Sequence, residues 1–198
     1  MKKIAMFILI FVSISSLYAD FKVMGGINLS KYSKPNRENF HRSYKMGFMV
    51  GFGLEKNITQ NMLLEFDFLF FQKGSKAKFD NFPYLKSKYY LNVISIPVLL
   101  RYQFLFGSSP FVLAGLELSY ILSHKKNIEG QDSIDIKNET KKSDFGYLIG
   151  CGYQLELQED LFFFIEARYH FGDRSLTNNI LESPMKTYTI LFLVGLRS

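Results

Sequence analysis

Three ionisable residues alternate along one short stretch of the chain: Glu166, Arg168 and His170. In an extended backbone, residues two positions apart point to the same side, so these three side chains would share one face. A histidine next to a carboxylate is the pair that activates a serine nucleophile in many hydrolases. No serine falls on that face, and the other histidines, His41 and His124, lie in predicted loops without a serine and a carboxylate at motif spacing. The sequence therefore predicts no catalytic residue.

Metal and cofactor chemistry also has little support in the sequence. Cys151 is the only cysteine, which excludes an internal disulfide and a metal centre built from several thiolates. The sequence shows no phosphate-binding loop and no cluster of metal ligands at motif spacing. We therefore expect no cofactor and no metal, and we interpret the charged residues as structural partners of one another.

The elements that hold these residues are predicted to be strands. In the segment 161–172, Phe163 and Ile165 alternate with Glu166 and Arg168, so one face is apolar and the other is charged. A helix would scatter each set around its axis. Segments with this period of two recur along the chain, at 21–30, 44–55, 61–74, 88–103, 109–121, 143–156, 161–172 and 186–197.

The connections between these segments alternate between long and short. Antiparallel barrels of bacterial outer membranes have this pattern, because their short turns face the periplasm and their long loops face the exterior. The predicted fold class is all-β: an eight-stranded antiparallel up-and-down transmembrane β-barrel with a polar interior, short periplasmic turns and long extracellular loops. The long links are predicted at 31–43, 75–87, 122–142 and 173–185, and the short links at 56–60, 104–108 and 157–160.

Composition indicates which face of the sheet meets lipid. Aromatic residues make up 17% of the chain, with 21 Phe and 12 Tyr, yet mean hydropathy is only +0.02. Apolar and polar residues are therefore finely mixed, as in a barrel wall whose every second residue faces hydrocarbon. An eight-stranded barrel is just wide enough inside for side chains, and glycines and paired charges fit that space better than aromatic rings. The tyrosines expected at the outer membrane interface are Tyr44, Tyr89, Tyr90, Tyr120, Tyr169 and Tyr188.

The charges on the inner face are predicted to form a lumen charge network, because buried charges need partners. Glu65 is expected to pair with Arg101 near the periplasmic end. Glu117 is expected to meet Glu166 and Arg168 higher in the barrel. The predicted members of the network are Glu65, Asp67, Arg101, Glu117, Glu166, Arg168, His170 and Arg197.

The first 19 residues have the pattern of a secretory signal peptide. Lys2 and Lys3 precede an apolar run from Ile4 to Val12, and small residues follow. The apolar run is shorter than the roughly 20 residues that span a bilayer as a helix. We predict residues 1–19 to be a cleaved signal peptide, residues 20–198 to be the barrel domain, and the protein to be exported to the outer membrane.

Two strand motifs carry a resemblance to a known family. One runs from Ile94 to Tyr102 and reads ISIPVLLRY, and the other runs from Glu166 to Tyr169 and reads EARY. Together with the segments around them, these motifs make the chain resemble the PorT-like family of outer-membrane β-barrels. The resemblance implies a small eight-stranded barrel of the OmpA or OmpX type in the outer membrane, and it implies no particular activity.

These features predict an integral outer-membrane protein with a structural or accessory role in the cell envelope, and not an enzyme. Net charge is +6 with the basic residues spread out, so no nucleic-acid partner is expected. The loops 31–43 and 75–87 are basic and are expected to bind lipopolysaccharide or other surface anions, whereas 122–142 is expected to be solvated. Other envelope or secretion proteins are further expected partners of a monomeric barrel. A lipid A-modifying enzyme, a narrow pore and an adhesin remain as alternatives.

Overall fold

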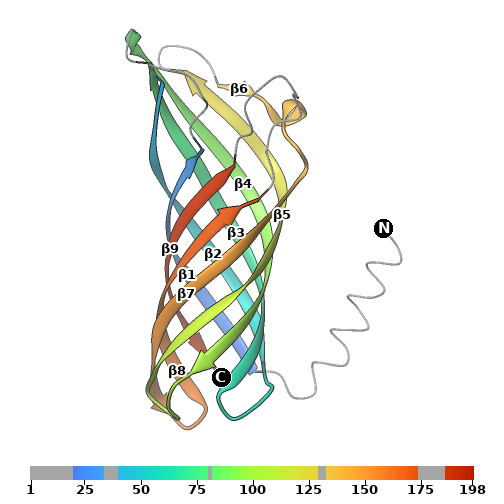
Figure 1. The fold of residues 1–198 in the computed structure, drawn as a ribbon, viewed down its shortest axis with the longest axis vertical. Coiled ribbons are helices and arrows are strands. Elements are labelled where there is room, and N and C mark those ends of the chain that lie inside the picture. The colour runs from blue at the N-terminus through green and yellow to red at the C-terminus, as the bar shows by residue number, and fades with distance from the viewer. Residues whose placement is uncertain (1–19, 34–39, 80–81, 129–132, 174–185) are drawn as a thin grey trace, which may run out of the picture.

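The computed structural model describes residues 20–33, 40–79, 82–128, 133–173 and 186–198, nearly all of them in strands. Tilted strands form a tall, closed wall around a central axis (Figure 1). The predicted signal peptide, residues 1–19, lies outside the described residues. The elements are β1 (Asp20–Tyr32), β2 (Phe40–Asn57), β3 (Met62–Phe79), β4 (Phe82–Gln103), β5 (Ser109–Ile128), β6 (Ile134–Asp135), the 3-10 helix η1 (Lys137–Glu139), β7 (Ser143–Gln158), β8 (Leu161–Gly172) and β9 (Thr187–Arg197).

Eight long strands close into one antiparallel barrel. From β1 to β5 each strand pairs with the next, β5 pairs with β7, and the series continues to β9. Pairing of β1 with β9, which sets Ile27 opposite Phe192, closes the wall. The two-residue strand β6 pairs with the outer end of β5 and is an addition to the barrel. The predicted eight-stranded, antiparallel, up-and-down barrel is confirmed.

The two ends of the barrel differ in their connections. Three tight connections, 58–61, 104–108 and 159–160, lie at the lower end of Figure 1 together with the C-terminus. Outer-membrane barrels keep short turns in the periplasm, so we assign this end to the periplasmic side and the opposite end to the exterior. Asp160 and Gly107 have positive φ angles of 62° and 70° in two of these turns, and aspartate and glycine tolerate that backbone better than most residues.

The strands β3 and β4 run further toward the exterior than the sequence pattern predicted. β3 continues to Phe79 and β4 begins at Phe82, so most of the predicted link 75–87 is strand. Side chains alternate through this extension, where Ser75 is buried and Lys76 is exposed. The basic residues assigned to a loop therefore stand on a sheet.

The first part of the predicted loop 122–142 is strand, which corrects the boundary of the loop, whereas residues 133–135, 137 and 138 are exposed, as predicted for a solvated segment. β5 continues to Ile128, and β6 pairs with it at Lys125 and Lys126 before η1 follows. Thr140, just after η1, is buried. No helix in the described ranges is both long enough and apolar enough to cross a membrane.

The outward face of the wall is apolar, as predicted. Phe48, Val50 and Phe52 are 49%, 55% and 47% exposed, whereas Met49 among them is 2% exposed. Large apolar side chains that stand in this way on alternate positions are the pattern of a surface covered by hydrocarbon.

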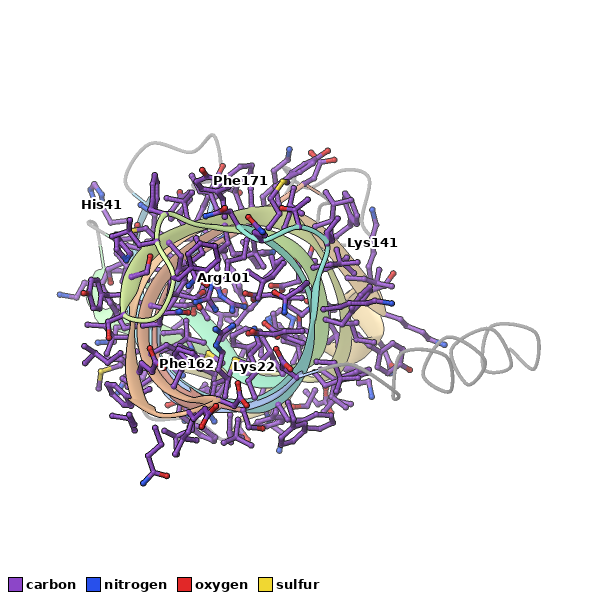
Figure 2. All side chains as sticks on the ribbon, turned by 90° about the horizontal axis from the view of Figure 1, so that it is seen from below. Lys22, His41, Arg101, Lys141, Phe162 and Phe171 are labelled. Carbon is purple, nitrogen blue, oxygen red and sulfur yellow. The ribbon has the colours of Figure 1, made fainter. Side chains whose placement is uncertain are left out.

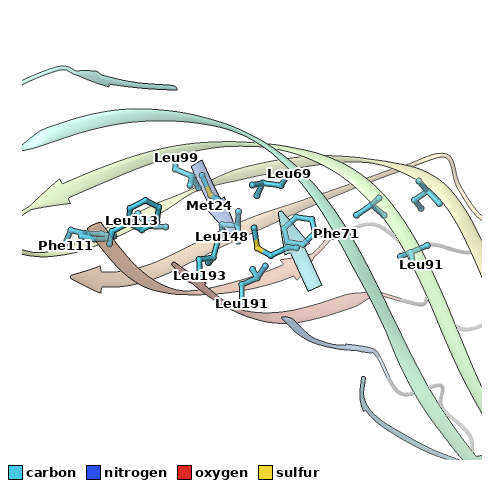
Figure 3. Packing of buried hydrophobic residues seen from close by; sticks show 14 of the residues in the cluster. Met24, Leu69, Phe71, Leu91, Leu99, Phe111, Leu113, Leu148, Leu191 and Leu193 are labelled. Carbon is cyan, nitrogen blue, oxygen red and sulfur yellow. The ribbon is translucent and has the colours of Figure 1, made fainter. Parts of the chain in front are cut away.

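The interior contains an apolar cluster between two polar layers, and this cluster was not predicted. Along the inner face of β3, Leu69 and Phe71 separate Asp67 from Lys73. Strands from all around the wall contribute to the cluster (Figure 3). Its members include Met24, Met49, Leu69, Phe71, Leu99, Leu113, Leu148, Phe164, Leu191 and Leu193.

Candidate functional site

The lower polar layer is built around the ammonium group of Lys22 on β1. Its Nζ lies 3.2 Å from Glu55 Oε1, 2.6 Å from Glu65 Oε2 and 2.9 Å from Asp67 Oδ1. Gly53 stands opposite Lys22 in the pairing of β1 with β2, and a Cβ there would come within 2.6 Å of Lys22 Cε. The glycine thus makes room for the lysine. In Figure 2 the side chain of Lys22 points into the ring of strands.

Two arginines extend this layer across the lumen. Arg101 Nη1 lies 3.4 Å from Glu65 Oε1, and Arg101 Nη2 donates a hydrogen bond to Gln154 Oε1. Arg168 Nη1 donates to Asp67 Oδ2 at 2.7 Å. The expected pairing of Glu65 with Arg101 therefore occurs, close to the periplasmic end.

Arg197 completes the layer next to the C-terminus, where its Nη1 donates to Glu55 Oε2 at 2.7 Å. Arg168 also hydrogen bonds to Glu166 on its own strand. A buried ionic cluster needs neutrality and several partners for each charge to offset lost hydration. This layer, which we call the lower network, balances four basic against four acidic side chains: Lys22, Arg101, Arg168 and Arg197 with Glu55, Glu65, Asp67 and Glu166.

The prediction that Glu117 meets Glu166 and Arg168 is wrong. Glu117 lies opposite Gly146 of β7, whereas Glu166 lies opposite Gly152. From 146 to 152 is six residues, or roughly 20 Å at a strand rise of about 3.4 Å per residue. Alternation predicts the face of a strand on which a residue lies, but the height of a residue depends on strand register and tilt.

Glu117 instead belongs to a second cluster, the upper network, above the apolar residues. Lys73 Nζ donates to Glu117 Oε1 at 2.9 Å, and the Ser119 hydroxyl donates to the same oxygen at 2.7 Å. His170 Nε2 lies 3.5 Å from that oxygen. His170 is therefore inside the barrel with a carboxylate, but its carboxylate comes from β5 and not from Glu166.

The upper network leaves several buried polar atoms without a hydrogen-bond partner in the described part of the chain. Asp144 accepts from the Thr187 hydroxyl at 3.0 Å through Oδ2. The unpartnered atoms here include Asn28 Oδ1, Glu117 Oε2, Asp144 Oδ1, His170 Nδ1 and Thr189 Oγ1. In the lower network, the unpartnered carboxylate oxygens, Glu55 Oε1 and Asp67 Oδ1, both lie within 3.2 Å of the Lys22 ammonium group.

Hydrolase geometry does not arise around His170. A catalytic triad places histidine between the serine and the carboxylate, whereas the Ser119 hydroxyl donates directly to Glu117. Both groups are buried in the lumen, away from the lipid-facing surface. Within the described ranges, no group of three or more His, Cys, Asp or Glu side chains is arranged to hold a metal ion.

Besides Asp144, near the start of its segment, sequence reasoning missed three charged members of the two networks, Lys22, Glu55 and Lys73. Lys22 and Glu55 stand at the edges of their predicted segments, and Lys73 stands one residue before the end of its segment. Each nevertheless keeps the inward phase of its strand, because Lys73 alternates with the buried residues Phe71 and Ser75. The same period of two that identified Arg101 would have found all three.

His124 is inside the barrel mouth, which corrects its assignment to a loop. Val93 pairs with Ile121 and Asn92 pairs with Ser123, so Leu122 is the extra residue of a β-bulge in β5. The bulge shifts the alternation by one residue, and His124 therefore points inward and is 0% exposed.

The imidazole of His124 links the wall to the segment after β6. The Tyr32 hydroxyl lies 3.1 Å from His124 Nε2, and His124 Nδ1 lies 2.7 Å from Thr140 Oγ1. The Thr140 hydroxyl donates to the Ile136 carbonyl, so we assign the proton on His124 to Nδ1 and the Tyr32 hydroxyl as donor to Nε2. Tyr89 packs edge-on against the Tyr32 ring, with 5.7 Å between the ring centroids. It therefore lies inside the mouth, and the prediction that it lies at the membrane interface is wrong.

The outer extension of the barrel carries a basic surface on β3 and β4. Lys76 and Lys88 are directly opposite each other in the pairing of these strands, and both are exposed. Lys78 is opposite Lys86 in the register of the same two strands. We call this row of cross-strand lysines the lysine ladder. His41, predicted in a loop, lies on β2 opposite Lys78 and is exposed beside the ladder.

Known proteins share this architecture. The profile of the family described as "Outer membrane protein beta-barrel domain" matches residues 13–180. The solved structure of OprG from Pseudomonas aeruginosa is similar over 91% of this chain and 95% of its own, with a TM-score of 0.57 and 13% identity. Neisserial surface protein A has a TM-score of 0.49 and 14% identity, over 88% of this chain and 95% of its own.

Ail, the attachment invasion locus protein of Yersinia pestis, has a TM-score of 0.48 and 15% identity, over 91% of this chain and 99% of its own. At 13% identity, the likeness to OprG shows a shared fold alone. No curated protein matches the chain in sequence. The family match covers most of the chain, which therefore belongs to the outer membrane protein beta-barrel domain family and lies in the bacterial outer membrane.

Proposed function

We propose that this protein is a non-enzymatic envelope barrel that holds anionic groups of lipopolysaccharide at its outer rim. The observation that supports the proposal most directly is the pairing of Lys76 with Lys88. Like charges directly opposite each other destabilise a sheet. A phosphate bound between the two ammonium groups would relieve that repulsion.

The surroundings of the lysine ladder favour an anion as well. From 74 to 90 the sequence contains four lysines and a single carboxylate, Asp80. Lys88 is separated by one residue from Tyr90, and tyrosines of this kind mark headgroup level in outer-membrane barrels. The ladder thus stands just above the expected interface, at the height of lipid phosphates.

The remaining parts of the proposal follow from the sequence. Residues 1–19 serve as a signal peptide that is removed on export, and the barrel works as a monomer. The resemblance to PorT-like barrels supports a structural or accessory role in the envelope, beside other envelope or secretion proteins. The two lumen networks serve that role as a packed interior.

Binding of purified protein in detergent micelles to lipopolysaccharide tests the proposal. Near an anionic surface each lysine contributes about 1 kcal/mol, so the double variant Lys76→Gln, Lys88→Gln should lose about 2 kcal/mol, or roughly thirtyfold in affinity. Added salt should weaken binding of the unaltered protein, since exposed charges are screened.

A matched variant distinguishes binding by the lysine ladder from a general effect of positive charge on affinity. Lys137→Gln, Lys142→Gln removes the same charge from exposed positions at the same end of the barrel, and its affinity should stay within about twofold, as expected for rim charges outside the site. Equal losses in both double variants, or full binding to lipopolysaccharide stripped of its phosphates, would contradict the proposal.

A further inference from the structure

An apolar groove of about 1070 Å³ crosses the lipid-facing side of β9, β1, β2 and β3. Its walls include Phe21, Val23, Val50, Phe68 and Leu196. Ligand-binding pockets have volumes of roughly 300–1,000 Å³, so the groove has room for a ligand of ordinary size. Its lining is almost wholly hydrocarbon, which excludes a polar occupant.

The groove exists because Gly25 leaves a gap in the outward row of side chains. Gly25 points outward between Val50 on β2 and Val194 on β9. A Cβ at this position would meet no atom closer than the Met49 carbonyl oxygen at 3.8 Å. At every other glycine in the described ranges, an added Cβ would come within 3 Å of another atom. The barrel's own packing therefore does not require glycine at position 25.

The position of the groove indicates which leaflet supplies its occupant. Phe21 and Leu196 lie next to the described ends of the barrel chain, on the periplasmic side. Gly25 is four residues from Phe21 along β1, roughly 13 Å at the rise of a strand. The groove thus runs from the periplasmic interface toward the middle of the bilayer, a depth that fits the acyl chains of the periplasmic leaflet.

A cation stands where the headgroup of such a lipid would lie. Lys56 is exposed on the outward face of β2, two residues beyond Leu54, at the periplasmic end. A second lipid-facing groove, of about 790 Å³, includes Ala167 in its lining. Near its periplasmic edge, at the turn that follows Phe104, lies the exposed carboxylate of Glu156 instead, and a phosphate would be repelled there.

We propose that the groove at Gly25 binds an acyl chain of a glycerophospholipid from the periplasmic leaflet, with Lys56 holding the lipid phosphate. The site is separate from the lysine ladder at the opposite end of the barrel. One phospholipid therefore stays bound on the β9–β1–β2–β3 side of the wall, whereas lipids around the rest of the barrel exchange.

Native mass spectrometry of the protein, extracted as an intact barrel from outer membranes in mild detergent, tests the proposal. The unaltered protein should retain one phospholipid. Gly25→Leu fills the groove and should lower retention about tenfold, the loss expected when roughly two methylene groups lose their contacts. Lys56→Gln should lower retention severalfold and flatten its salt dependence. Ala167→Leu, which fills the second groove, should retain phospholipid as the unaltered protein does.

Folding of each variant is checked by the mobility shift of the unheated barrel on a denaturing gel. Absence of retained phospholipid from the folded, unaltered protein would overturn the proposal, as would equal losses in Gly25→Leu and Ala167→Leu. Crosslinked dimers that disappear in Gly25→Leu would assign the groove to a second copy of the chain and would also overturn it.

Discussion

The lower and upper networks fill the same barrel but are held in different ways. In the lower network Lys22 faces three carboxylates within 3.2 Å, and Glu65 faces three cations within 3.8 Å. In the upper network Glu117 has one lysine partner, and Asp144 is held by the hydroxyl of Thr187. Loss of one group in the lower network therefore disturbs several charges at once, whereas loss in the upper network disturbs few.

The two networks also connect different parts of the wall. The lower network takes side chains from β1, β2, β3, β4, β8 and β9, and it crosses the seam where β1 and β9 close the barrel. The charged and hydroxyl groups bonded to Glu117 come from β3 and β5, with His170 on β8 nearby. The closing strands are thus linked by charged side chains in the lower network, and by uncharged groups such as Asn28 and Thr187 at the upper level.

Substitution of Glu65 should give the largest effect and tests the lower network directly. Glu65→Gln removes the charge that faces Lys22, Arg101 and Arg168, and an unpaired buried charge typically costs 3–5 kcal/mol, so we expect a loss of about that size in the free energy of unfolding. Urea titration in lipid vesicles measures it. Glu159→Gln, an exposed carboxylate at the same end, should change stability by less than about 0.5 kcal/mol. A loss below about 1 kcal/mol for Glu65→Gln would contradict the comparison.

Ser119→Ala should have a smaller effect and sharpens the contrast. Glu117 keeps the Lys73 ammonium group as a donor and has His170 nearby, so the expected loss is about 1.5–3 kcal/mol, the range for one hydrogen bond to a charged group. The same urea titration applies. If Ser119→Ala cost as much as Glu65→Gln, the upper network would be no less constrained than the lower one.

His124→Phe tests the mouth and should cost about 1 kcal/mol, because a ring of similar size loses two neutral hydrogen bonds to Tyr32 and Thr140. Its clearer effect should be local. The segment 133–142 should become more sensitive to added protease, since His124 joins Thr140 to the wall. Unchanged cleavage of that segment would show that β6 alone holds it in place.

The sequence pattern predicted the faces of the strands much better than their heights. Arg101 and His170 were placed inside from alternation alone, because a strand has only two faces and lipid demands apolar residues on one of them. Glu117 was placed at the wrong level, because register and tilt arise from the pairing of whole strands. Both the face and the height of Glu65 and Arg101 were predicted correctly, since Glu65 lies near the tight turn 58–61 and Arg101 lies near the tight turn 104–108, both at the periplasmic end.

The failures at the outer end have a different physical cause. The lysine-rich stretch of β3 and β4 looks like a loop in composition, yet the backbone remains paired beyond the level of the membrane. At His124, one extra residue in β5 reverses the phase of the alternation, and a period of two cannot reveal such a bulge in advance. Lys22 and Glu55 were missed for a simpler reason, namely that they stand at the edges of segments whose boundaries carry an error of a few residues.

The smallest expected effect comes from Thr189 of β9, which differs in one respect from Thr187 on the same strand. Thr187 Oγ1 donates to Asp144, whereas Thr189 Oγ1 is buried and has no partner in the described part of the chain. Replacing a bonded group leaves its partner unsatisfied, but replacing an unbonded buried hydroxyl by a methyl group is nearly neutral or stabilising. Thr187→Val should therefore lose about 1–3 kcal/mol in the urea titration, and Thr189→Val should change by less than about 0.5 kcal/mol or gain stability. A clear loss in Thr189→Val would show that this hydroxyl bonds to an ordered water or ion, and the contrast between the two threonines would then fail.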